Sequence, residues 1–596
     1  MHKIAILDYG SQLTHLLATE VRRLGVYSEI LEPEVTASEL KDYQGIILSG
    51  GPNSVYEQGA PQVDSAIFEL GLPILGICYG HQLIVQEMGG KVESGHTKEY
   101  GKAKLHIDNA EGILSSFTQG EDTQVWMSHG DNVTKLPEGF KGLGSTSDCQ
   151  YCVLGNDDRK IYSIQFHLEV VHTERGIEML KNFLDVCQVN YDWSIENFLE
   201  EKLEAIRAQV GDKKVFLLVS GGVDSTVAFA LLDRAIGHEN VYGMFVDTGF
   251  MRYGEVDFVA ESLRSIGVKN LRVYDGSAKY FEALKEVYDP EAKRKIIGDL
   301  FLDIQKEVSD ELNLNPDEWL LGQGTIYPDT IESGGTKHAD KIKTHHNRVP
   351  QIEELIAQGK IIEPIADLYK DEVRQLGELL DLPAHLVHRH PFPGPGLAVR
   401  TLCMEHPEPA EAINLNLPAG IQGHVLPVKS VGVQGDGRTY RHPLALSGNF
   451  PSFAEALDLS TTLTNRHFAI NRVLWQFAPD QFVNAESVAH TYLTPERIEV
   501  LQKADKIFND LIQKSGDHQK IWQAPVVLVP VQINDLPGES IVLRPISSRE
   551  AMTADVYPLA QEIIQEFVTQ IRAQNLPISG VFYDLTHKPP GTIEWE

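Results

Sequence analysis

Residues 73–82 read PILGICYGHQ, an apolar run that ends in a Gly-x-Cys-x-Gly turn and continues in a helical pattern. Two similar apolar runs precede it, KIAILDYG at 3–10 and YQGIILSGGPNS at 43–54. Between these two, QLTHLLATEVRRLG at 12–25 repeats its apolar residues at helical spacing and stops at a glycine. Short apolar strands joined by amphipathic helices predict a parallel sheet with crossover helices, in a domain that we place at residues 1–190.

A second unit of the same kind follows. A charged helical pattern covers 191–212, and then an apolar strand, VFLLV at 215–219, leads through SGGVDS into a helix. The next strand is VYGMFVDTG at 241–249. The Gly- and Pro-rich run HPFPGPGLAVR at 390–400 cannot form regular structure and indicates a boundary. These patterns predict a second doubly wound domain at residues 191–400.

Residues 401–596 have a different character, with more strands and fewer crossover helices. The stretches 425–446 and 524–547 each read as strand, turn, strand, and we consider them a possible weak internal repeat. The expected fold class is therefore α/β, with two successive doubly wound parallel-sheet domains followed by a smaller α+β carboxyl-terminal domain at 401–596. That last domain possibly contains a duplicated strand-rich unit.

Composition excludes several classes of protein. The chain has 596 residues, with 52 Lys and Arg against 84 Asp and Glu, so its net charge of −32 argues against a nucleic-acid partner. Five cysteines in so long a chain do not indicate a disulfide framework. The first residues lack the pattern of a secretory signal, and no apolar run reaches the ~20 residues of a membrane helix. We therefore expect no membrane association and a cytoplasmic location.

The turn around Cys78 has the features of a nucleophile elbow. Gly76 and Gly80 allow a sharp strand-to-helix turn, and a helix amino terminus favours a thiolate. The backbone N–H of Tyr79 can donate to a developing oxyanion, and the pair Gly50–Gly51 offers a second donor. A buried core thiol would be the better interpretation of an isolated cysteine.

A base for that thiol is available downstream. His167 and Glu169 are two residues apart in IYSIQFHLEV, which we read as a strand, so both side chains should share one face. Glu169 can then orient His167, and His167 can deprotonate Cys78.

The stretches LSGGP, GICYGHQ, MSHGD at 127–131 and FHLEVVHT together resemble the class I glutamine amidotransferases. The resemblance implies Cys78 as nucleophile, His167 as base and Glu169 as the orienting carboxylate. It also implies that Gln82 and Asp131 contact the glutamine substrate. This family usually has Pro between the His and the Glu, where this chain has Leu168. We expect the leucine to be tolerated.

SGGVDS at 220–225 follows a strand and opens a helix, so its N–H groups can form an anion cradle. It lacks the Gly-Lys-Ser/Thr of a Walker A loop. The context resembles the ATP pyrophosphatase family, which implies that the loop binds pyrophosphate and that Asp224 helps to place Mg²⁺ supplied with ATP. Asp247, at the end of the next strand, is either a nucleotide contact or part of a strand-ending turn. The residues assigned to ATP are Ser220, Gly221, Gly222, Val223, Asp224, Ser225, Thr226 and Asp247.

Further strings extend the resemblance to almost the whole chain. DPEAKRKIIG at 289–298, LGQGTIYPDTIES at 321–333, KTHHN at 343–347, HPFPGPGLAVR, GDGRTY at 435–440, IWQAPVVL at 521–528 and KPPGTIEWE at 588–596 are similar to those of GMP synthetases. The family binds xanthosine monophosphate (XMP). Motif by motif, the resemblance implies that the XMP contacts are Arg294, Asp436, Gln523, Lys588 and Glu594.

The function implied is adenylation of XMP by ATP, with release of pyrophosphate, and displacement of AMP by ammonia from glutamine to give GMP. The substrates would be glutamine, ATP and XMP. The family implies a homodimer formed through the carboxyl-terminal part, while a duplicated unit could replace that contact within a monomer. The alternatives are a ligase with the same two modules acting on another acceptor, and a nucleotide-binding scaffold without catalytic activity.

Overall fold

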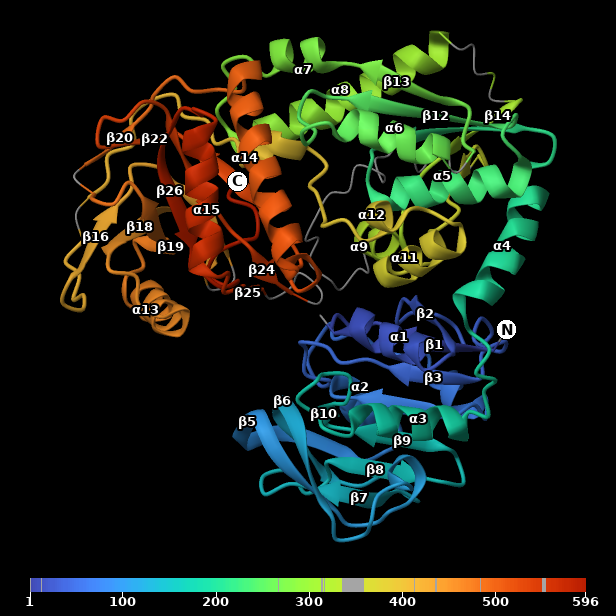
Figure 1. Cartoon of the computed structure of the whole chain (residues 1–596). Helices are drawn as coiled ribbons and strands as arrows, with labels where there is room; N and C mark the ends of the chain where they lie inside the picture. Colours follow the sequence, from blue (N-terminus) through green and yellow to red (C-terminus); the bar gives the residue numbers. More distant parts are fainter. Residues whose placement is uncertain are drawn as a thin grey trace. The chain divides into compact units, whose positions relative to one another are not determined.

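The computed structural model describes residues 2–11, 13–265, 267–311, 315, 317–334, 358–411, 413–434, 437–482, 484–548 and 554–596 (Figure 1). The chain forms two compact units. Unit 1 comprises Met1–Gln209, Thr325–Gly359 and Glu363–Leu379. Unit 2 comprises Val210–Gly324, Lys360–Ile362 and Leu380–Glu596. None of the described helices is both long and apolar enough to cross a membrane.

Unit 1 contains a ten-stranded sheet in the order β10-β6-β5-β7-β8-β9-β4-β3-β1-β2. Its parallel part comprises β1 (Lys3–Leu7), β2 (Tyr27–Leu31), β3 (Gly45–Leu48), β4 (Ile74–Ile77) and β9 (Ile161–Ile164). Alternate residues of β1 enter two different cores, because Ile4 and Ile6 pack in one and Ala5 and Leu7 in the other. A sheet buried on both faces is the expected doubly wound arrangement. The helices of this unit are α1 (Thr14–Arg23), α2 (Tyr79–Glu87), α3 (Gly176–Val186), α4 (Ile195–Val210), α9 (Tyr327–Gly334) and α11 (Lys370–Leu379).

The sheet of unit 1 also extends beyond the predicted parallel core. Strands β5 (Lys91–Ile107), β6 (Asp122–Lys135), β7 (Lys141–Ser145) and β8 (Val153–Asn156) pair antiparallel with their neighbours, as does the two-residue β10 (Phe166–His167). This extension matters for the site, because it supplies Asp131 from β6 and His167 from β10.

The first part of unit 2 is a five-stranded parallel sheet in the order β13-β12-β11-β14-β15. The chain order reverses between β11 and β14, which makes the carboxyl end of β11 a topological switch point, where ligands bind in open α/β sheets. The strands are β11 (Lys214–Val219), β12 (Val241–Asp247), β13 (Leu271–Asp275), β14 (Trp319–Gly322) and β15 (Ile361–Ile362). The helices are α5 (Val223–Ile236), α6 (Glu255–Ser265), α7 (Ser277–Ala283), α8 (Pro290–Glu311) and α12 (Ala384–Val387). Helix α8 begins at Pro290, and the carboxylate of Asp289, just before it, accepts from the Ala292 N–H at 2.8 Å.

The carboxyl-terminal sheet has the order β16-β18-β19-β26-β23-β21, with β17 beside β18. Each half consists of two antiparallel strands, a helix and a strand parallel to its neighbour. The first half is β16 (Ile421–Val425), β18 (Gly437–Gly448), α13 (Phe453–Arg466) and β19 (Ile470–Ala478). The second is β21 (Val526–Val529), β23 (Glu539–Leu543), α15 (Gln561–Ala573) and β26 (Ile578–Asp584). The halves join antiparallel through β19 and β26, where Trp475 lies opposite Tyr583.

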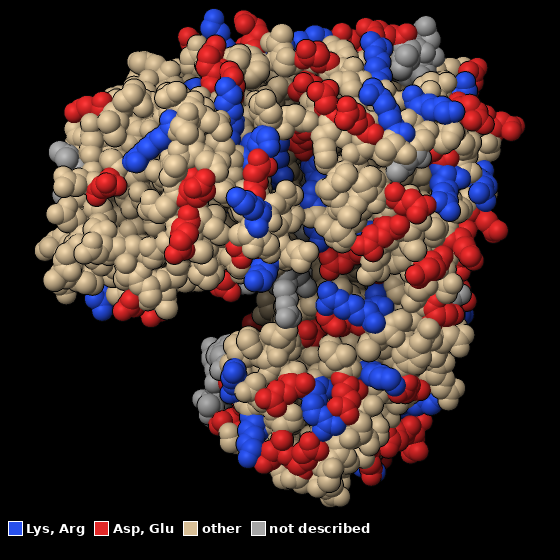
Figure 2. All heavy atoms as spheres, in the orientation of Figure 1, with Lys and Arg blue, Asp and Glu red and all other residues tan. Residues whose placement is uncertain are grey.

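The other elements of this part are β17 (Ser430–Gln434), β20 (Ala485–Ser487), α14 (Pro495–Ser515), β22 (Val531–Ile533), β24 (Ile546–Ser547) and β25 (Asp555–Val556). Figure 1 shows α14 and α15 in orange and red beside the carboxyl-terminal strands. Figure 2 shows acidic and basic side chains interspersed on the face in view.

Candidate active site

Cys78 stands at the turn between β4 and α2, in a backbone conformation that few side chains adopt. Its φ is 49° and its ψ −103°, and such strain is found mainly at functional sites. The two glycines make the turn possible. A Cβ at Gly76 would lie 2.4 Å from the Gly80 carbonyl oxygen, and one at Gly80 would lie 2.3 Å from the Leu48 carbonyl oxygen. The predicted elbow is thus present.

The structure brings Cys78, His167 and Glu169 into one chain of contacts. The Cys78 Sγ lies 3.4 Å from His167 Nε2, and His167 Nδ1 lies 2.8 Å from Glu169 Oε1. All three residues are less than a tenth exposed. Burial alone would lower the pKa of His167, but Cys78 and Glu169 outweigh it and raise the pKa to about 11. The arrangement therefore favours a charged imidazolium beside the Cys78 sulfur.

The backbone that carries this pair differs from the expected strand. Strand β10 ends at His167, and residues 168–170 form a bend. His167 and Glu169 therefore do not share the predicted strand, although their side chains do meet. Leu168 is 1% exposed and packs in the hydrophobic core of unit 1, so an apolar side chain suits this position. Its carbonyl also passes so close to Gly176 that a Cβ there would lie 1.9 Å from the oxygen.

Two backbone segments are available for an oxyanion beside Cys78. A Cβ at Gly50 would be 3.6 Å from both Cys78 Cβ and His167 Cε1, so this glycine lies directly against the catalytic pair. Tyr79 opens α2, and its N–H donates to no protein acceptor among the described residues. Gly51 serves a different purpose, because a Cβ there would lie 2.5 Å from the Tyr9 carbonyl oxygen. Gly50 and Tyr79 therefore lie next to Cys78, and their role as oxyanion donors stays a prediction.

Gln82 and Asp131 also lie together at this site. The Gln82 amide donates to the Gln165 side-chain oxygen at 3.1 Å and to the Asp131 carbonyl at 3.4 Å. The Asp131 carboxylate accepts from the Ser54 hydroxyl at 2.5 Å and from the Tyr56 hydroxyl at 2.8 Å. Sequence reasoning missed Gln165, Ser54 and Tyr56, although Ser54 and Tyr56 lie two and four residues after the quoted LSGGP motif.

The SGGVDS loop forms the predicted strand–loop–helix turn at the switch point of unit 2. Gly221 has φ 77°, and a Cβ there would lie 2.8 Å from the Phe245 ring. Ser225 accepts from the Ser220 N–H at 3.1 Å, and the Thr226 hydroxyl donates to the Gly222 carbonyl at 2.8 Å. These bonds fix the loop at the amino terminus of α5, where the first amides of a helix can serve as an anion cradle.

Two carboxyl groups accompany the loop. Asp224 lies in the first turn of α5. Asp247 ends β12 and accepts from the Gly249 N–H at 2.8 Å, while burial and the nearby Asp275 and Asp257 raise its pKa. Among the described residues, no group of three or more His, Cys, Asp or Glu side chains could hold a metal ion. One carboxylate beside a phosphate cradle fits Mg²⁺, which is commonly bound by one or two carboxylates together with substrate phosphates.

The residues assigned to XMP are partly brought together. Gln523 donates to Glu594 Oε1 at 3.2 Å, and Arg294 contacts the backbone carbonyl of Glu596. Lys588 pairs through its backbone with Ala554. Asp436 and the KTHHN motif lie outside the described residues.

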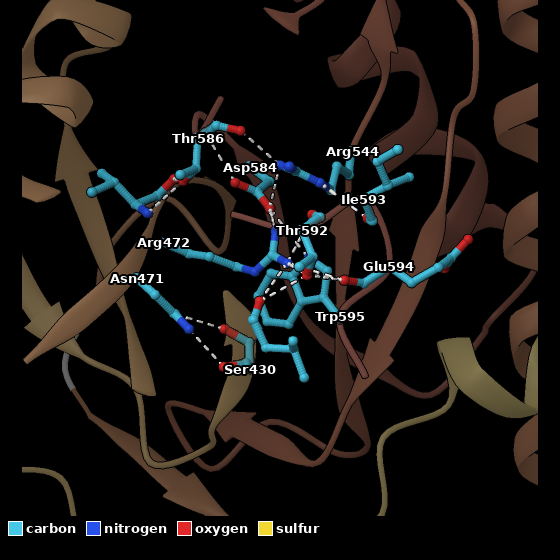
Figure 3. A network of polar contacts seen from close by, with 12 residues as sticks. Ser430, Asn471, Arg472, Arg544, Asp584, Thr586, Thr592, Ile593, Glu594 and Trp595 are labelled. Carbon is cyan, nitrogen blue, oxygen red and sulfur yellow. Dashed lines mark hydrogen bonds and ion pairs between the residues drawn. The ribbon is translucent and has the colours of Figure 1, made fainter. Parts of the chain in front are cut away.

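The KPPGTIEWE segment is held by a buried ionic network that sequence reasoning missed. Asp584 Oδ2 lies 2.8 Å from both Arg472 and Arg544, and all three side chains are fully buried. Trp595 donates to the same oxygen at 3.2 Å. Figure 3 shows Asp584 between the two guanidinium groups, with the Trp595 ring alongside. Arg472 also donates to the backbone carbonyls of Thr592 and Glu594, at 2.9 and 3.1 Å, so the network shapes the backbone of this segment.

Three family models match successive parts of the chain. Residues 5–187 match the family described as glutamine amidotransferase class-I, residues 193–286 match NAD synthase, and residues 510–595 match the GMP synthase C terminal domain. Curated relatives match along the whole chain. A probable glutamine-hydrolyzing GMP synthase of Leptospira interrogans is 48% identical, covering 100% of this chain and 99% of the relative.

The similarity extends to distant organisms. The glutamine-hydrolyzing GMP synthase of Aquifex aeolicus is 38% identical, covering 100% of this chain and 99% of the relative. A probable GMP synthase of Caenorhabditis elegans is 37% identical, and the match covers 100% of this chain and 92% of the relative. Such identity over the full length of each protein, together with an intact Cys78 site and phosphate loop, shows that the chain belongs to the family of glutamine-hydrolysing GMP synthases.

Proposed function

We propose that this enzyme converts XMP to GMP, using ammonia that it releases from glutamine and ATP to activate the acceptor. The observation that carries the proposal is the contact chain from Cys78 through His167 to Glu169, at 3.4 and 2.8 Å, in a chain that also holds an SGGVDS loop. An enzyme that releases ammonia from glutamine and adds it to an ATP-activated acceptor needs both the cysteine site and the phosphate loop. Linking both in one chain keeps the ammonia at high effective concentration.

In the amidase half, the Cys78 thiolate attacks the side-chain carbonyl carbon of glutamine. The N–H groups of Tyr79 and Gly50 stabilise the oxyanion, and Gln82 and Asp131 bind the rest of the substrate. His167 gives its proton to the departing ammonia and then takes one from the water that hydrolyses the thioester, while Glu169 fixes the ring.

In the synthetase half, the residues 220–226 hold the pyrophosphate portion of ATP on backbone N–H groups and hydroxyls. Asp247 lies at the end of the adjacent strand, where a nucleotide would pass. The C2 oxygen of XMP attacks the α-phosphorus and pyrophosphate leaves. Ammonia then attacks C2, and AMP carries away the C2 oxygen. Mg²⁺, held by Asp224 together with the phosphates, would spread the charge that develops on the leaving group.

Arg294, Asp436, Gln523, Lys588 and Glu594 would bind XMP. Arginine and lysine suit its phosphate, and the carboxylates and the amide suit its hydroxyls and base. The hydrogen bond from Gln523 to Glu594 supports a common role for these two residues in binding XMP.

We divide the chain into an amidotransferase domain at 1–190, an ATP pyrophosphatase domain at 191–400 and an XMP-binding domain at 401–596. The two halves of the carboxyl-terminal sheet have one strand order and direction, which supports a duplication joined at β19 and β26. Such an internal junction would replace a subunit contact and leave a monomer, whereas the family resemblance favours a homodimer; sedimentation distinguishes them. All five cysteines are free thiols, which supports a reducing compartment such as the cytoplasm.

The test of the proposal is a Cys78→Ala variant, assayed for GMP with glutamine or with an ammonium salt. We expect loss of glutamine-dependent synthesis with ammonium-dependent synthesis retained. Cys187→Ala is the matched control, because Cys187 is also buried but lies at the end of α3, and it should retain both activities. Retention of glutamine-dependent synthesis by Cys78→Ala would refute the assigned nucleophile.

A further inference from the structure

Arg400 is a fully buried arginine to which no role has been given so far. It ends a short 3-10 helix, Gly396–Arg400, so the expectation that 390–400 forms no regular structure is wrong for these five residues. The Arg400 guanidinium makes a two-bond contact with Glu594, at 3.1 Å from Nε to Oε2 and 2.8 Å from Nη2 to Oε1. The Arg400 side chain is 0% exposed, whereas that of Glu594 is 20% exposed. The carboxylate thus has one side fixed by the arginine and another open to solvent or ligand.

The surroundings of Arg400 hold it in place. Its guanidinium lies 5.2 Å from the centre of the Phe392 ring, in the same 390–400 segment. Burial would lower the pKa of Arg400, but Glu594 outweighs it, with smaller contributions from Asp505 and Glu255, so the pKa is raised. Arg400 is therefore a permanent, immobile cation facing Glu594.

Gln523 completes the arrangement. Its amide NH₂ donates to the Pro391 carbonyl at 3.0 Å and to Glu594 Oε1 at 3.2 Å. Both of its N–H donors are thereby engaged, which leaves the Gln523 carbonyl oxygen as the group it can offer. A carboxylate paired with arginine also only accepts. Gln523 and Glu594 together present acceptors, so a ligand must meet them with N–H or O–H donors.

The backbone of Glu594 is fixed independently of its side chain. Arg472 donates to its carbonyl at 3.1 Å and is itself held by Asp584, as Figure 3 shows. With the backbone secured by Arg472, the direction of the carboxylate depends on Arg400.

We propose that Arg400 is a positioning residue for XMP: it aligns the Glu594 carboxylate, and through it Gln523, as an acceptor-only surface that receives the N–H or ribose O–H donors of the nucleotide. The proposal rests on the proposed function, in which Glu594 and Gln523 contact XMP. Arg400 itself need not touch the nucleotide. Its removal should weaken XMP binding and leave the reaction of bound XMP little changed.

The test measures KM for XMP and kcat in Arg400→Met, Arg400→Lys, Glu594→Gln and Arg400→Met/Glu594→Gln, with ammonium as nitrogen source. Loss of one member of a buried charge pair predicts a rise in KM for XMP of about 100-fold in Arg400→Met, with kcat and the KM for ATP within a few-fold. Arg400→Lys keeps the charge but not the two-bond geometry, so its KM for XMP should lie between those of the unaltered enzyme and Arg400→Met. The double variant should be no worse than Glu594→Gln, because Arg400 acts through that carboxylate.

Arg497 provides a matched control. It makes a similar two-bond contact with Glu539, at 2.7 and 2.5 Å, and is also largely buried. Arg497→Met should lower stability and leave the KM for XMP unchanged. If Arg400→Met does not fold, the comparison of Arg400→Lys with Glu594→Gln still decides the matter.

Several results would overturn the proposal. One is an equal KM for XMP in Arg400→Met and Arg497→Met. Another is a lower kcat in Arg400→Met with its KM for XMP unchanged. A third is a KM for XMP in the double variant that equals the product of the two single effects. A Glu594→Gln enzyme with normal KM for XMP would also overturn it, because Arg400 would then have no contact to align. Failure of the proposed function is separate, since the unaltered enzyme would then form no GMP at all.

Discussion

The Asp584 network predicts a large and specific loss of stability in Asp584→Asn. Asp584 is the carboxylate between two fully buried arginines, Arg472 and Arg544, and its other oxygen accepts from the Thr586 N–H at 3.0 Å. An asparagine that keeps its oxygen towards the arginines turns its NH₂ towards the Thr586 N–H, so two donors would face each other. The substitution also leaves the buried guanidinium groups of Arg472 and Arg544 without the anion that they share.

The expected cost is about 3–5 kcal/mol, the usual range when one partner of a buried ion pair is removed. The arginines keep some backbone partners, such as the Thr586 carbonyl at 2.9 Å from Arg544, which argues for the lower part of that range. Asp555→Asn is the control. The Asp555 side chain is 82% exposed, and within the described part of the chain its only ion pair is with His587, so the change should cost less than about 0.5 kcal/mol.

Urea unfolding followed by tryptophan fluorescence is the appropriate assay. Trp595, one of six tryptophans, donates to Asp584 and is 1% exposed, so part of the emission change reports on the network itself. We expect a lower urea midpoint in Asp584→Asn with an unchanged slope. A loss below about 1 kcal/mol, or one equal to that of Asp555→Asn, would refute the view that this carboxylate holds the two arginines in place.

Three further predictions concern the two reaction sites. Gly80→Ala places a Cβ 2.3 Å from the Leu48 carbonyl oxygen, so glutamine-dependent GMP formation should fall at least about tenfold while ammonium-dependent formation persists; equal losses in both assays would contradict this. The raised pKa of His167, about 11 against an ordinary 6.5, means that its charge stabilises the fold fully below pH 6.5 and progressively less as pH rises towards 11. The melting-temperature difference between the unaltered enzyme and His167→Gln should therefore shrink from pH 6.5 to pH 10, and a constant or growing difference would count against it. Chelation of Mg²⁺ should stop GMP formation from either nitrogen source but leave glutamine hydrolysis intact, which ammonia release measures directly; continued GMP synthesis would exclude the proposed part of Asp224.

Local patterns predicted the frame of the protein well. The strand-to-helix turns at Cys78 and at 220–225 are specified by residues close in sequence, because glycine permits backbone approaches and helix starts that other residues do not. The start of α8 at Pro290 is also local, because proline suits the first turn of a helix and the Asp289 carboxylate accepts from the Ala292 N–H. The expected strand through Glu169 failed because the chain bends after His167, a feature set by the packing of Leu168 and Gly176 rather than by alternation.

Contacts between distant segments could not be read from such patterns. Asp584 and Arg472 are 112 residues apart, and Arg400 and Glu594 are 194 apart. In the sequence each is an isolated charge in an apolar or irregular stretch, where a solvated surface position is the usual interpretation. Only the fold shows that these charges are buried and paired. Gln165 was missed in the same way, since its contact with Gln82 depends on β9 and β4 lying side by side.

The measurement that tests the central claim most directly is mass-spectrometric detection of GMP formed from XMP, ATP and Mg²⁺, with either glutamine or an ammonium salt. The account predicts GMP from both nitrogen sources, with AMP and pyrophosphate formed in equal amounts. GMP from ammonium alone would show that the amidase half does not deliver ammonia, and Leu168 would be the first residue to examine. No GMP from either source would contradict the assignment of XMP as the acceptor.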